Sequence, residues 1–230
     1  MTEPKRPGPP ALSAGARAAL AWAHGARFLT TASQLDQLPQ GDLPEIAFVG
    51  RSNAGKSTAI NALAQRRQLA FASKTPGRTQ HINLFALGPK DEPDSYLADL
   101  PGYGYATVER SAKLRWQQVM ADYLELRRNL GGVVLMVDSR LGFTPLDQQL
   151  LSFIAPRVGN GEVKLLVLLT KADKLNKREQ QASLQAAQAA LADLATDSAD
   201  LGLLLFSAPK QIGIADLAET VHGWLHPASD

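Results

Sequence analysis

Two glycines, a lysine and a serine stand at a spacing that suits the binding of an anion. Gly50, Gly55, Lys56 and Ser57 form the pattern G-x-x-x-x-G-K-S between the apolar run 45–50 and a helical pattern. Glycine tolerates backbone angles that other side chains forbid, so successive N–H groups can face an anion, and the following helix adds the positive end of its dipole. An ordinary glycine turn is the alternative, but the strand before and the helix after favour a phosphate-binding P-loop. In such a loop Lys56 contacts the β- and γ-phosphates and Ser57 ligates Mg²⁺.

A second short motif closes another apolar run. The sequence DLPG at 99–102 ends the run 95–100. Asp99 is predicted to hold Mg²⁺ through a water molecule, and the N–H of Gly102 is predicted to meet the γ-phosphate. The pattern D-x-x-G also marks simple turns, so its meaning comes from its place in the chain.

A third motif predicts which base is bound. The sequence TKAD at 170–173 ends the apolar run 163–170 and resembles the N/T-K-x-D guanine motif. A carboxylate at Asp173 can accept hydrogen bonds from both N1–H and the 2-amino group of guanine, whereas adenine presents an acceptor at N1 and is repelled. The motif therefore predicts GTP rather than ATP.

Two further segments are assigned by their order along the chain. The loop KTPGRTQ at 74–80 lies between the first helix and the second strand of the core, where Thr79 is the candidate for a second protein ligand of Mg²⁺ and Thr75 is the runner-up. A plain turn rich in Gly, Pro and Thr is the alternative. Ser207 and Ala208 follow the last apolar run, at the place of a loop whose backbone N–H contacts guanine O6, and this assignment rests on position alone.

The predicted site is the sum of these motifs. Its catalytic residues are Lys56, Thr79 and Gly102, and its metal is held by Ser57, Thr79 and, through water, Asp99. The residues predicted to contact the nucleotide are Gly50, Arg51, Ser52, Asn53, Ala54, Gly55, Lys56, Ser57, Gly77, Arg78, Thr79, Gln80, His81, Asp99, Leu100, Pro101, Gly102, Thr170, Lys171, Ala172, Asp173, Phe206, Ser207 and Ala208. The predicted cofactors are GTP or GDP and Mg²⁺, with K⁺ as a further candidate.

The elements that must position these motifs follow from periodicity. Short apolar runs alternate with segments of helical spacing, which predicts a mainly parallel sheet with helices on both faces and ligands at the carboxyl ends of its strands. The expected strands are 45–50, 81–87, 95–100, 131–138, 163–170 and 201–207, and the expected helices are 57–66, 109–128, 145–156, 176–195 and 213–225. Because two strands follow each other between 81 and 100, one antiparallel hairpin is expected. The fold class is thus α/β, with a six-stranded sheet.

Composition narrows the class of protein. The 230 residues carry 24 basic and 22 acidic side chains and no cysteine, which excludes disulfides, thiolate metal sites and prenyl or palmitoyl anchors. No uncharged run approaches the roughly 20 residues that a transmembrane helix needs. A basic stretch without an acidic residue surrounds the P-loop, and it predicts either a positive patch or a merely solvated face. Its members are Arg51, Lys56, Arg66, Arg67, Lys74 and Arg78.

The first 27 residues are expected to form a flexible extension to a single domain at 28–230. Residues 1–10 are rich in proline and polar groups. From residue 11 on, a plain helix is the favoured interpretation. Residues 11–27 carry Arg17 and Arg27 but no acidic residue, which also suits an organelle transit peptide. Import through residues 1–27 therefore stays open beside a bacterial cytoplasmic location.

Longer stretches resemble one family, the EngB/YihA ribosome-biogenesis GTP-binding proteins. The matches are EIAFVGRSNAGKST, SKTPGRTQHINLF, LADLPGYGYA, the helix W-x-x-x-M-x-x-Y-L-x-x-R at 116–127 and VDSRLGFTPLDQQLL at 137–151. The similarity covers about 28–225, and Ala54 and Thr58 are mild departures from its pattern. It implies a Ras-like fold, Mg²⁺-dependent GTP binding and hydrolysis, a role in maturing the large ribosomal subunit, and a link to normal cell division and septation.

Two residues refine the expected mechanism. Tyr103 follows DLPG, where Ras-like proteins carry the glutamine that orients the attacking water, so slow intrinsic turnover is expected. Asn53 corresponds to the P-loop asparagine with which related bacterial GTPases hold K⁺ beside the phosphates, and K⁺ is therefore expected to stimulate hydrolysis. The alternative is that Asn53 only tolerates the backbone angles of the loop.

Three other functions compete with that of an assembly GTPase. Asp173 argues against a P-loop ATPase or kinase, and a membrane-associated switch lacks a lipidation motif in GWLHPASD. The third is a nucleotide-regulated module with negligible intrinsic hydrolysis that docks on RNA or protein. The expected partners are GTP or GDP and, as the resemblance implies, the rRNA and proteins of the precursor large subunit. No DNA sequence specificity, no membrane and a monomer are expected.

Overall fold

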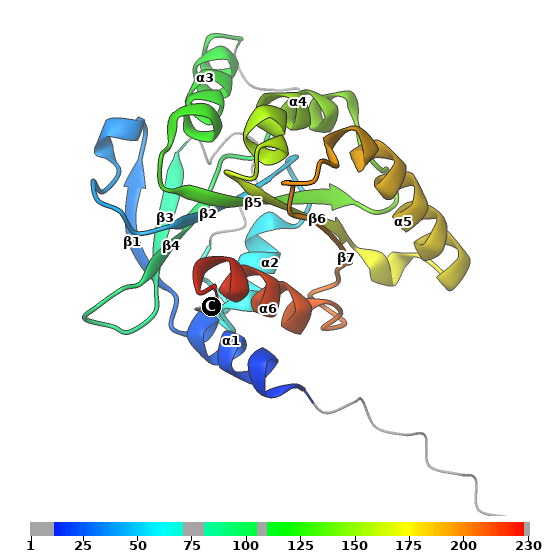
Figure 1. Ribbon diagram of the computed structural model, residues 1–230, viewed down its shortest axis with the longest axis horizontal. Coiled ribbons are helices and arrows are strands. Elements are labelled where there is room, and N and C mark those ends of the chain that lie inside the picture. The colour runs from blue at the N-terminus through cyan, green and yellow to red at the C-terminus, as the bar shows by residue number, and fades with distance from the viewer. Residues whose placement is uncertain (1–11, 71–80, 105–109, 228–230) are drawn as a thin grey trace, which may run out of the picture.

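The sheet lies at the centre of the molecule. The computed structural model describes residues 12–70, 81–104 and 110–227, with only the backbone of 110–117. Those residues form one seven-stranded sheet in the order β1-β3-β4-β2-β5-β6-β7 (Figure 1). The strands are β1 Arg27–Ala32, β2 Glu45–Gly50, β3 Ile82–Leu87, β4 Ser95–Asp99, β5 Leu130–Asp138, β6 Lys164–Thr170 and β7 Leu201–Leu205. Strand β3 runs in the direction opposite to the other six strands, so the predicted α/β class with one antiparallel strand is confirmed.

The predicted number of six strands was wrong, because β1 was not counted. This strand pairs with β3 at the edge of the sheet, between Arg27↔Ala86 and Ala32↔Ile82. Phe28 and Leu29 are 56% and 43% exposed there. An edge strand is not apolar on both faces, so it lacks the continuous apolar run by which the central strands were found.

Helices cover both faces of the sheet, as predicted. Helices α1 (Ala14–His24), α2 (Lys56–Leu63) and α6 (Ile214–Leu225) lie on one face, and α3 (Arg110–Leu126), α4 (Pro145–Gly159) and α5 (Lys177–Leu191) lie on the other (Figure 1). Short 3₁₀ turns occupy Leu35–Gln37, Ala172–Lys174 and Ala192–Leu194.

Strand β5 shows why the central strands are apolar throughout. Val133, Leu135 and Val137 belong to the core beneath α3, α4 and α5. Val134 and Met136 belong to the opposite core beneath α1, α2 and α6. Successive side chains of a strand point to opposite faces, so a strand covered on both sides needs apolar residues at every position. These buried strands fix the edge at which the predicted motifs emerge.

Helix α1 lies within the predicted N-terminal extension. Ser13 caps it by accepting a 2.8 Å hydrogen bond from Ala16 N, and Ala19 and Ala23 are fully buried in the core that α6 shares. The predicted helix is therefore confirmed, and it packs onto the domain. The predicted flexible extension of residues 1–27 therefore includes a helix that is packed on the core, and residues 1–11 lie outside the described residues.

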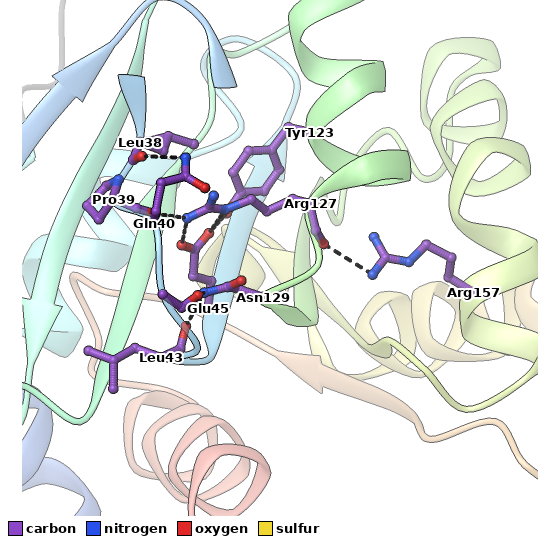
Figure 2. Close-up of polar contacts among 10 residues, drawn as sticks. Leu38, Pro39, Gln40, Leu43, Glu45, Tyr123, Arg127, Asn129 and Arg157 are labelled. Carbon is purple, nitrogen blue, oxygen red and sulfur yellow. Dashed lines mark hydrogen bonds and ion pairs between the residues drawn. The ribbon is translucent and has the colours of Figure 1, made fainter. Parts of the chain in front are cut away.

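A buried polar network joins the start of β2 to the end of α3 (Figure 2). Glu45 is fully buried and accepts from Tyr123 Oη at 2.7 Å, from Arg127 Nε at 3.0 Å and from Arg127 Nη2. Arg157 of α4 donates to Leu124 O and Arg127 O at 2.7 and 3.2 Å, so it binds carbonyl groups at the end of α3. Every charge here has a partner, as burial requires. The network fixes the strand that leads into the P-loop against α3 and α4.

Candidate nucleotide-binding site

The loop after β2 has the geometry of a phosphate cradle. A Cβ atom on Gly50 would lie 2.8 Å from the Cβ and O atoms of Met136, so only glycine fits where β2 passes β5. Gly55 has φ 99° and Asn53 has φ 63°, and α2 begins directly afterwards at Lys56. Left-handed angles let the chain turn sharply into the helix, whose first N–H groups have no partner within the helix. An anion can bind to those groups.

A cation and a carboxylate meet at the ends of β2 and β4. Lys56 forms an ion pair with Asp99, and the two residues are only 8% and 2% exposed. Because β2 and β4 are parallel neighbours, their carboxyl ends bring the predicted phosphate-binding lysine and the predicted metal carboxylate together. The structure thus joins two motifs that lie 43 residues apart in the sequence.

The segment after Asp99 runs along the P-loop. Ser52 N donates to Tyr103 O at 2.8 Å, and Tyr103 N donates to Gly50 O at 3.2 Å. A Cβ atom on Gly102 would lie 3.2 Å from Ser52 Cα, so the two backbones approach closely at this glycine. The side chain of Tyr103 turns inward instead, is 3% exposed, and donates to Asp147 Oδ1 at 2.6 Å. Its phenol is engaged with α4.

The TKAD motif is hydrogen-bonded to the phosphate loop. Thr170 Oγ1 donates to Ala54 O at 2.7 Å, and Lys171 Nζ donates to Asn53 O at 2.8 Å. Two successive residues of one motif therefore bind two successive carbonyls of the other. Lys171 Nζ also donates to Asp138 Oδ2 at 2.8 Å. This arrangement fixes the loop that is predicted to read the base relative to the loop that is predicted to bind the phosphates.

The carboxylate that is predicted to read guanine is held by its own neighbours. Ser207 Oγ donates to Asp173 Oδ1 at 2.6 Å, and Lys174 Nζ lies 3.4 Å from Asp173 Oδ2. The hydrogen bond from Ser207 and the charge of Lys174 lower the pKa of Asp173, so the group is a pure acceptor at neutral pH. Ser207 N donates to Ile212 O at 3.0 Å. Of the two residues predicted to contact guanine O6 through a backbone N–H, Ser207 and Ala208, this leaves Ala208 as the donor.

Some predicted residues fall elsewhere or outside the description. Gly77, Arg78, Thr79 and Gln80 lie outside the described residues, as do Thr75 and Lys74. His81 is exposed, and its Nδ1 lies 2.8 Å from Ser33 Oγ beyond the end of β1. Leu100, Ala172 and Phe206 are buried apolar residues that support their loops from below.

The predicted positive patch is reduced by the structure. Lys56 is buried against Asp99, and Arg51 is half-buried with a fully buried Nε atom. Arg66 and Arg67 are exposed just after α2. The described part of the basic stretch thus divides into an inner pair beside the P-loop and an outer pair on the surface.

The donors near Asp99 suit Mg²⁺. Ser57 supplies a hydroxyl in the first turn of α2 and Asp99 supplies a buried carboxylate, both of which are hard oxygen ligands. Residues 12–70, 81–104 and 110–227 contain no group of three or more His, Cys, Asp or Glu that could enclose a metal by themselves. A serine hydroxyl, one carboxylate and the phosphates of a nucleotide together make a set of hard oxygen ligands of the kind that Mg²⁺ uses. The residues present therefore fit a nucleotide with its Mg²⁺.

Three residues near the site escaped the sequence reasoning. Asp138 contacts Lys171, and Asp147 contacts Tyr103, yet neither was predicted as part of the site. Both lie in VDSRLGFTPLDQQLL, which supported the family resemblance. A polar residue at the carboxyl end of a buried strand was the available signal for Asp138. Arg140 also binds Asp138, at 2.7 to 2.9 Å, from two residues further along the chain. Its sequence context gave no signal of this contact.

The fold and the two joined loops define a GTP-binding protein with a Ras-like fold. Residues 45–171 match the family model described as 50S ribosome-binding GTPase. The chain is 57% identical over 208 residues to the "Probable GTP-binding protein EngB" of Acidovorax ebreus, which covers 90% of this chain and 92% of the relative. The protein of the same name from Polaromonas sp. is 54% identical over 99% of this chain and 91% of the relative. The chain therefore belongs to the EngB family of GTP-binding proteins, as its motifs predicted.

Solved structures show the same fold at low identity. A crystal structure of a probable GTP-binding protein EngB matches 79% of this chain and 98% of its own with a TM-score of 0.60 at 20% identity. Era, in complex with MgGDPNP and nucleotides 1506–1542 of 16S ribosomal RNA, matches 83% of this chain and 59% of its own with a TM-score of 0.62 at 21% identity. In the described part of the chain, no helix has the length and apolar character to cross a bilayer.

Proposed function

We propose that this chain is a GTPase switch that acts in the assembly of the large ribosomal subunit and hydrolyses GTP slowly by itself. The observation that carries the proposal is the pair of hydrogen bonds from Thr170 and Lys171 to the carbonyls of Ala54 and Asn53. It holds a loop suited to guanine at a fixed distance from a loop suited to phosphates. Membership of the EngB family and the match to a 50S ribosome-binding GTPase model support the ribosomal role.

The roles of the residues follow from their positions. Lys56 binds the β- and γ-phosphates, Gly102 N–H contacts the γ-phosphate, and Asp173 accepts from guanine. Ser57 and Asp99, and Thr79 by its place in the sequence, would hold Mg²⁺, which would supply positive charge to offset the negative charge of the phosphates. Lys56 and Asp99 form an ion pair with each other. With nucleotide and Mg²⁺ bound, Lys56 would face a phosphate and Asp99 would hold the metal through its water.

Slow intrinsic hydrolysis is proposed because the side chain of Tyr103, the residue after Gly102, is hydrogen-bonded to Asp147. The phenol of Tyr103 is buried and bonded to Asp147, so it cannot orient a water at the γ-phosphate from there. Backbone groups, a cation or a partner must position that water. The same observation favours a second candidate, a nucleotide-regulated module with negligible hydrolysis. Single-turnover hydrolysis by the pure chain separates the two, since a nucleotide-regulated module would leave GTP intact over hours.

The partners follow from the family and the surface. We propose that the precursor large subunit is the docking partner and that the exposed Arg66 and Arg67 contribute salt-sensitive RNA contacts. We further propose that the chain works as a monomer in the bacterial cytoplasm, since its relatives come from bacteria. The requirement for cell division and septation would follow from defective ribosome assembly. Sedimentation of lysate with GDP or a non-hydrolysable GTP analogue tests the docking. Absence from ribosomal particles with both nucleotides would contradict it.

The nucleotide itself is tested with Asp173→Asn. Wild type and variant are titrated with fluorescent GDP and then competed with GTP, ATP and xanthosine triphosphate. Wild type should prefer GTP, and the variant should shift toward the xanthine nucleotide because its amide donates to the 2-oxo group where the carboxylate accepted from the 2-amino group. If neither protein distinguishes the bases, the guanine-reading role of Asp173 fails and only a phosphate-binding loop remains.

A further inference from the structure

Asp138 lies at the centre of a small polar cluster that the proposed function does not use. It ends β5, is 9% exposed, and stands beside Thr170 in the register of β5 and β6. Its Oδ2 accepts from Lys171 Nζ at 2.8 Å and from Arg140 Nη2 at 2.7 Å. Its Oδ1 accepts from Arg140 Nε at 2.9 Å and from Arg140 N at 3.1 Å. One carboxylate thus holds two cations that come from different loops.

Among the described residues, only one of these two cations is hydrogen-bonded to the P-loop. Lys171 Nζ donates to Asn53 O as well as to Asp138, whereas the side chain of Arg140 is 46% exposed and its hydrogen bonds in the described part of the chain go to Asp138. The ammonium group of Lys171 is therefore shared between a P-loop carbonyl and the carboxylate. The hydrogen bond to a carboxylate is the stronger of the two kinds, since both partners are charged.

Packing alone does not hold Lys171 in this place. Its side chain is 32% exposed, and its backbone has φ 59°, a left-handed conformation that a lysine seldom adopts. A hollow of about 210 Å³ opens beside it, lined among others by Asn53, Asp138 and Arg140. A long, flexible side chain next to free space keeps one rotamer only if a specific contact fixes it. Lys171 has two such contacts, with Asn53 O and with Asp138, and the one with Asp138 is the charge-assisted one.

The electrostatics of Asp138 agree with this role. Burial works to raise the pKa of Asp138, but hydrogen bonds from Arg140 and Lys171 outweigh it and hold the pKa well below its usual value. The carboxylate is therefore ionised across the physiological range and keeps the ammonium group of Lys171 beside the P-loop.

We propose that Asp138 is a positioning residue of the nucleotide site, which holds the Lys171 ammonium on Asn53 O and thereby keeps the phosphate loop in its binding conformation. The inference rests on the proposed binding of guanine nucleotides. Loss of Asp138 should release Lys171, loosen the loop and let the nucleotide leave faster, while Asp173 still selects guanine.

A double-mutant cycle on the dissociation of fluorescent GDP tests the proposal. Asp138→Asn is almost isosteric and keeps an acceptor for Arg140 N, and it should speed GDP dissociation on the order of tenfold, as expected for one charge-assisted contact. Lys171→Ala should speed it at least as much. In the double variant, the Asp138 change should add little, because its effect passes through Lys171. The preference for GTP over xanthosine triphosphate should stay that of wild type in Asp138→Asn.

Arg140→Gln is the matched control, because it removes the other cation from the same carboxylate. It should leave GDP dissociation close to wild type. Should Asp138→Asn fail to fold, Asp138→Ser offers a smaller residue without the negative charge, and the cycle is run with it. Unchanged dissociation in the Asp138 variant, an equal acceleration by Arg140→Gln, or full additivity with Lys171→Ala would overturn the proposal. If wild type itself binds no guanine nucleotide, the proposed function fails and the inference fails with it.

Discussion

Tyr103 and Asp147 are joined by a 2.6 Å hydrogen bond between buried side chains, 44 residues apart in the sequence. Asp147 also accepts from Thr144 N and Thr144 Oγ1 at 2.7 and 2.6 Å, as the N3 residue of the capping box of α4. The backbone of Tyr103 is meanwhile bonded to the P-loop at Gly50 and Ser52. One tyrosine therefore connects the phosphate loop to the first turn of α4.

Tyr103→Phe should separate the structural and catalytic roles of this residue. We expect a loss of about 1–3 kcal/mol in the free energy of unfolding, because Asp147 loses one buried donor but keeps two. We expect the rate of GTP hydrolysis to stay within about twofold, a barrier change of about 0.4 kcal/mol, because the phenol is engaged with Asp147 of α4. Urea unfolding and single-turnover hydrolysis measure the two effects. A large fall in the hydrolysis rate at unchanged GDP affinity would place the phenol in the mechanism.

The stability of the protein should fall in alkali for a related reason. Burial raises the pKa of Tyr103 and of Tyr123 far above the usual value for tyrosine. A nearby carboxylate adds to the rise in each pKa, Asp147 for Tyr103 and Glu45 for Tyr123. In the unfolded chain both titrate near pKa ~10. The unfolded state then binds fewer protons than the native one, so stability is intact below pH ~10 and declines above it by up to about 1.4 kcal/mol per pH unit for each tyrosine. The slope of unfolding free energy between pH 10 and 11 should flatten in the Tyr103→Phe, Tyr123→Phe double variant.

The buried pair of Glu45 and Arg127 allows a sharp comparison with a neighbouring residue. Arg127→Met leaves the Glu45 carboxylate buried with Tyr123 as its remaining donor, and we expect a loss of about 3–5 kcal/mol in the free energy of unfolding. Arg128→Met is the control, because Arg128 is exposed and next in the chain, and it should change stability by less than about 0.5 kcal/mol.

A second substitution, at Glu45, tests whether the stranded carboxylate causes the loss of stability. Adding Glu45→Gln to Arg127→Met should recover part of the loss, since no uncompensated charge then remains in the core. Urea denaturation at pH 7 gives the free energy of unfolding of wild type, the single variants Arg127→Met and Glu45→Gln, their double variant, and the control Arg128→Met. If the double variant is as unstable as the sum of its single changes, the cost lies in lost packing and not in the stranded carboxylate.

Most of the fold and the motif positions could be predicted because their signals are local. Strands β2, β5 and β6 are apolar at nearly every position since both faces are covered, and the P-loop pattern lies within eight consecutive residues. The edge strand β1 gave a weaker signal because Phe28 and Leu29 face outward. Helix α4 was expected to end at 156, yet it continues through Pro156 to Gly159.

Contacts between distant residues could not be predicted in the same way. Asp138 and Lys171 are 33 residues apart, and only the pairing of β5 with β6 brings them together. The direction of the Tyr103 side chain depends likewise on where α4 begins. The sequence indicated which residue types could bind a nucleotide, but the second layer of polar side chains behind them depends on the packed sheet.

Asn53 allows two explanations that one substitution can separate. It is exposed, and its φ of 63° is one that asparagine and glycine tolerate better than other residues. If its amide holds K⁺ beside the phosphates, wild type should hydrolyse GTP faster in KCl than in NaCl, and Asn53→Gly should lose that difference although its backbone is unstrained. If Asn53 only tolerates the angle, the glycine variant should match wild type in both salts. Asn53→Ala adds the strain of a left-handed alanine, about 1–2 kcal/mol, and serves as the control for backbone effects. Equal wild-type rates in the two salts would remove K⁺ from the mechanism.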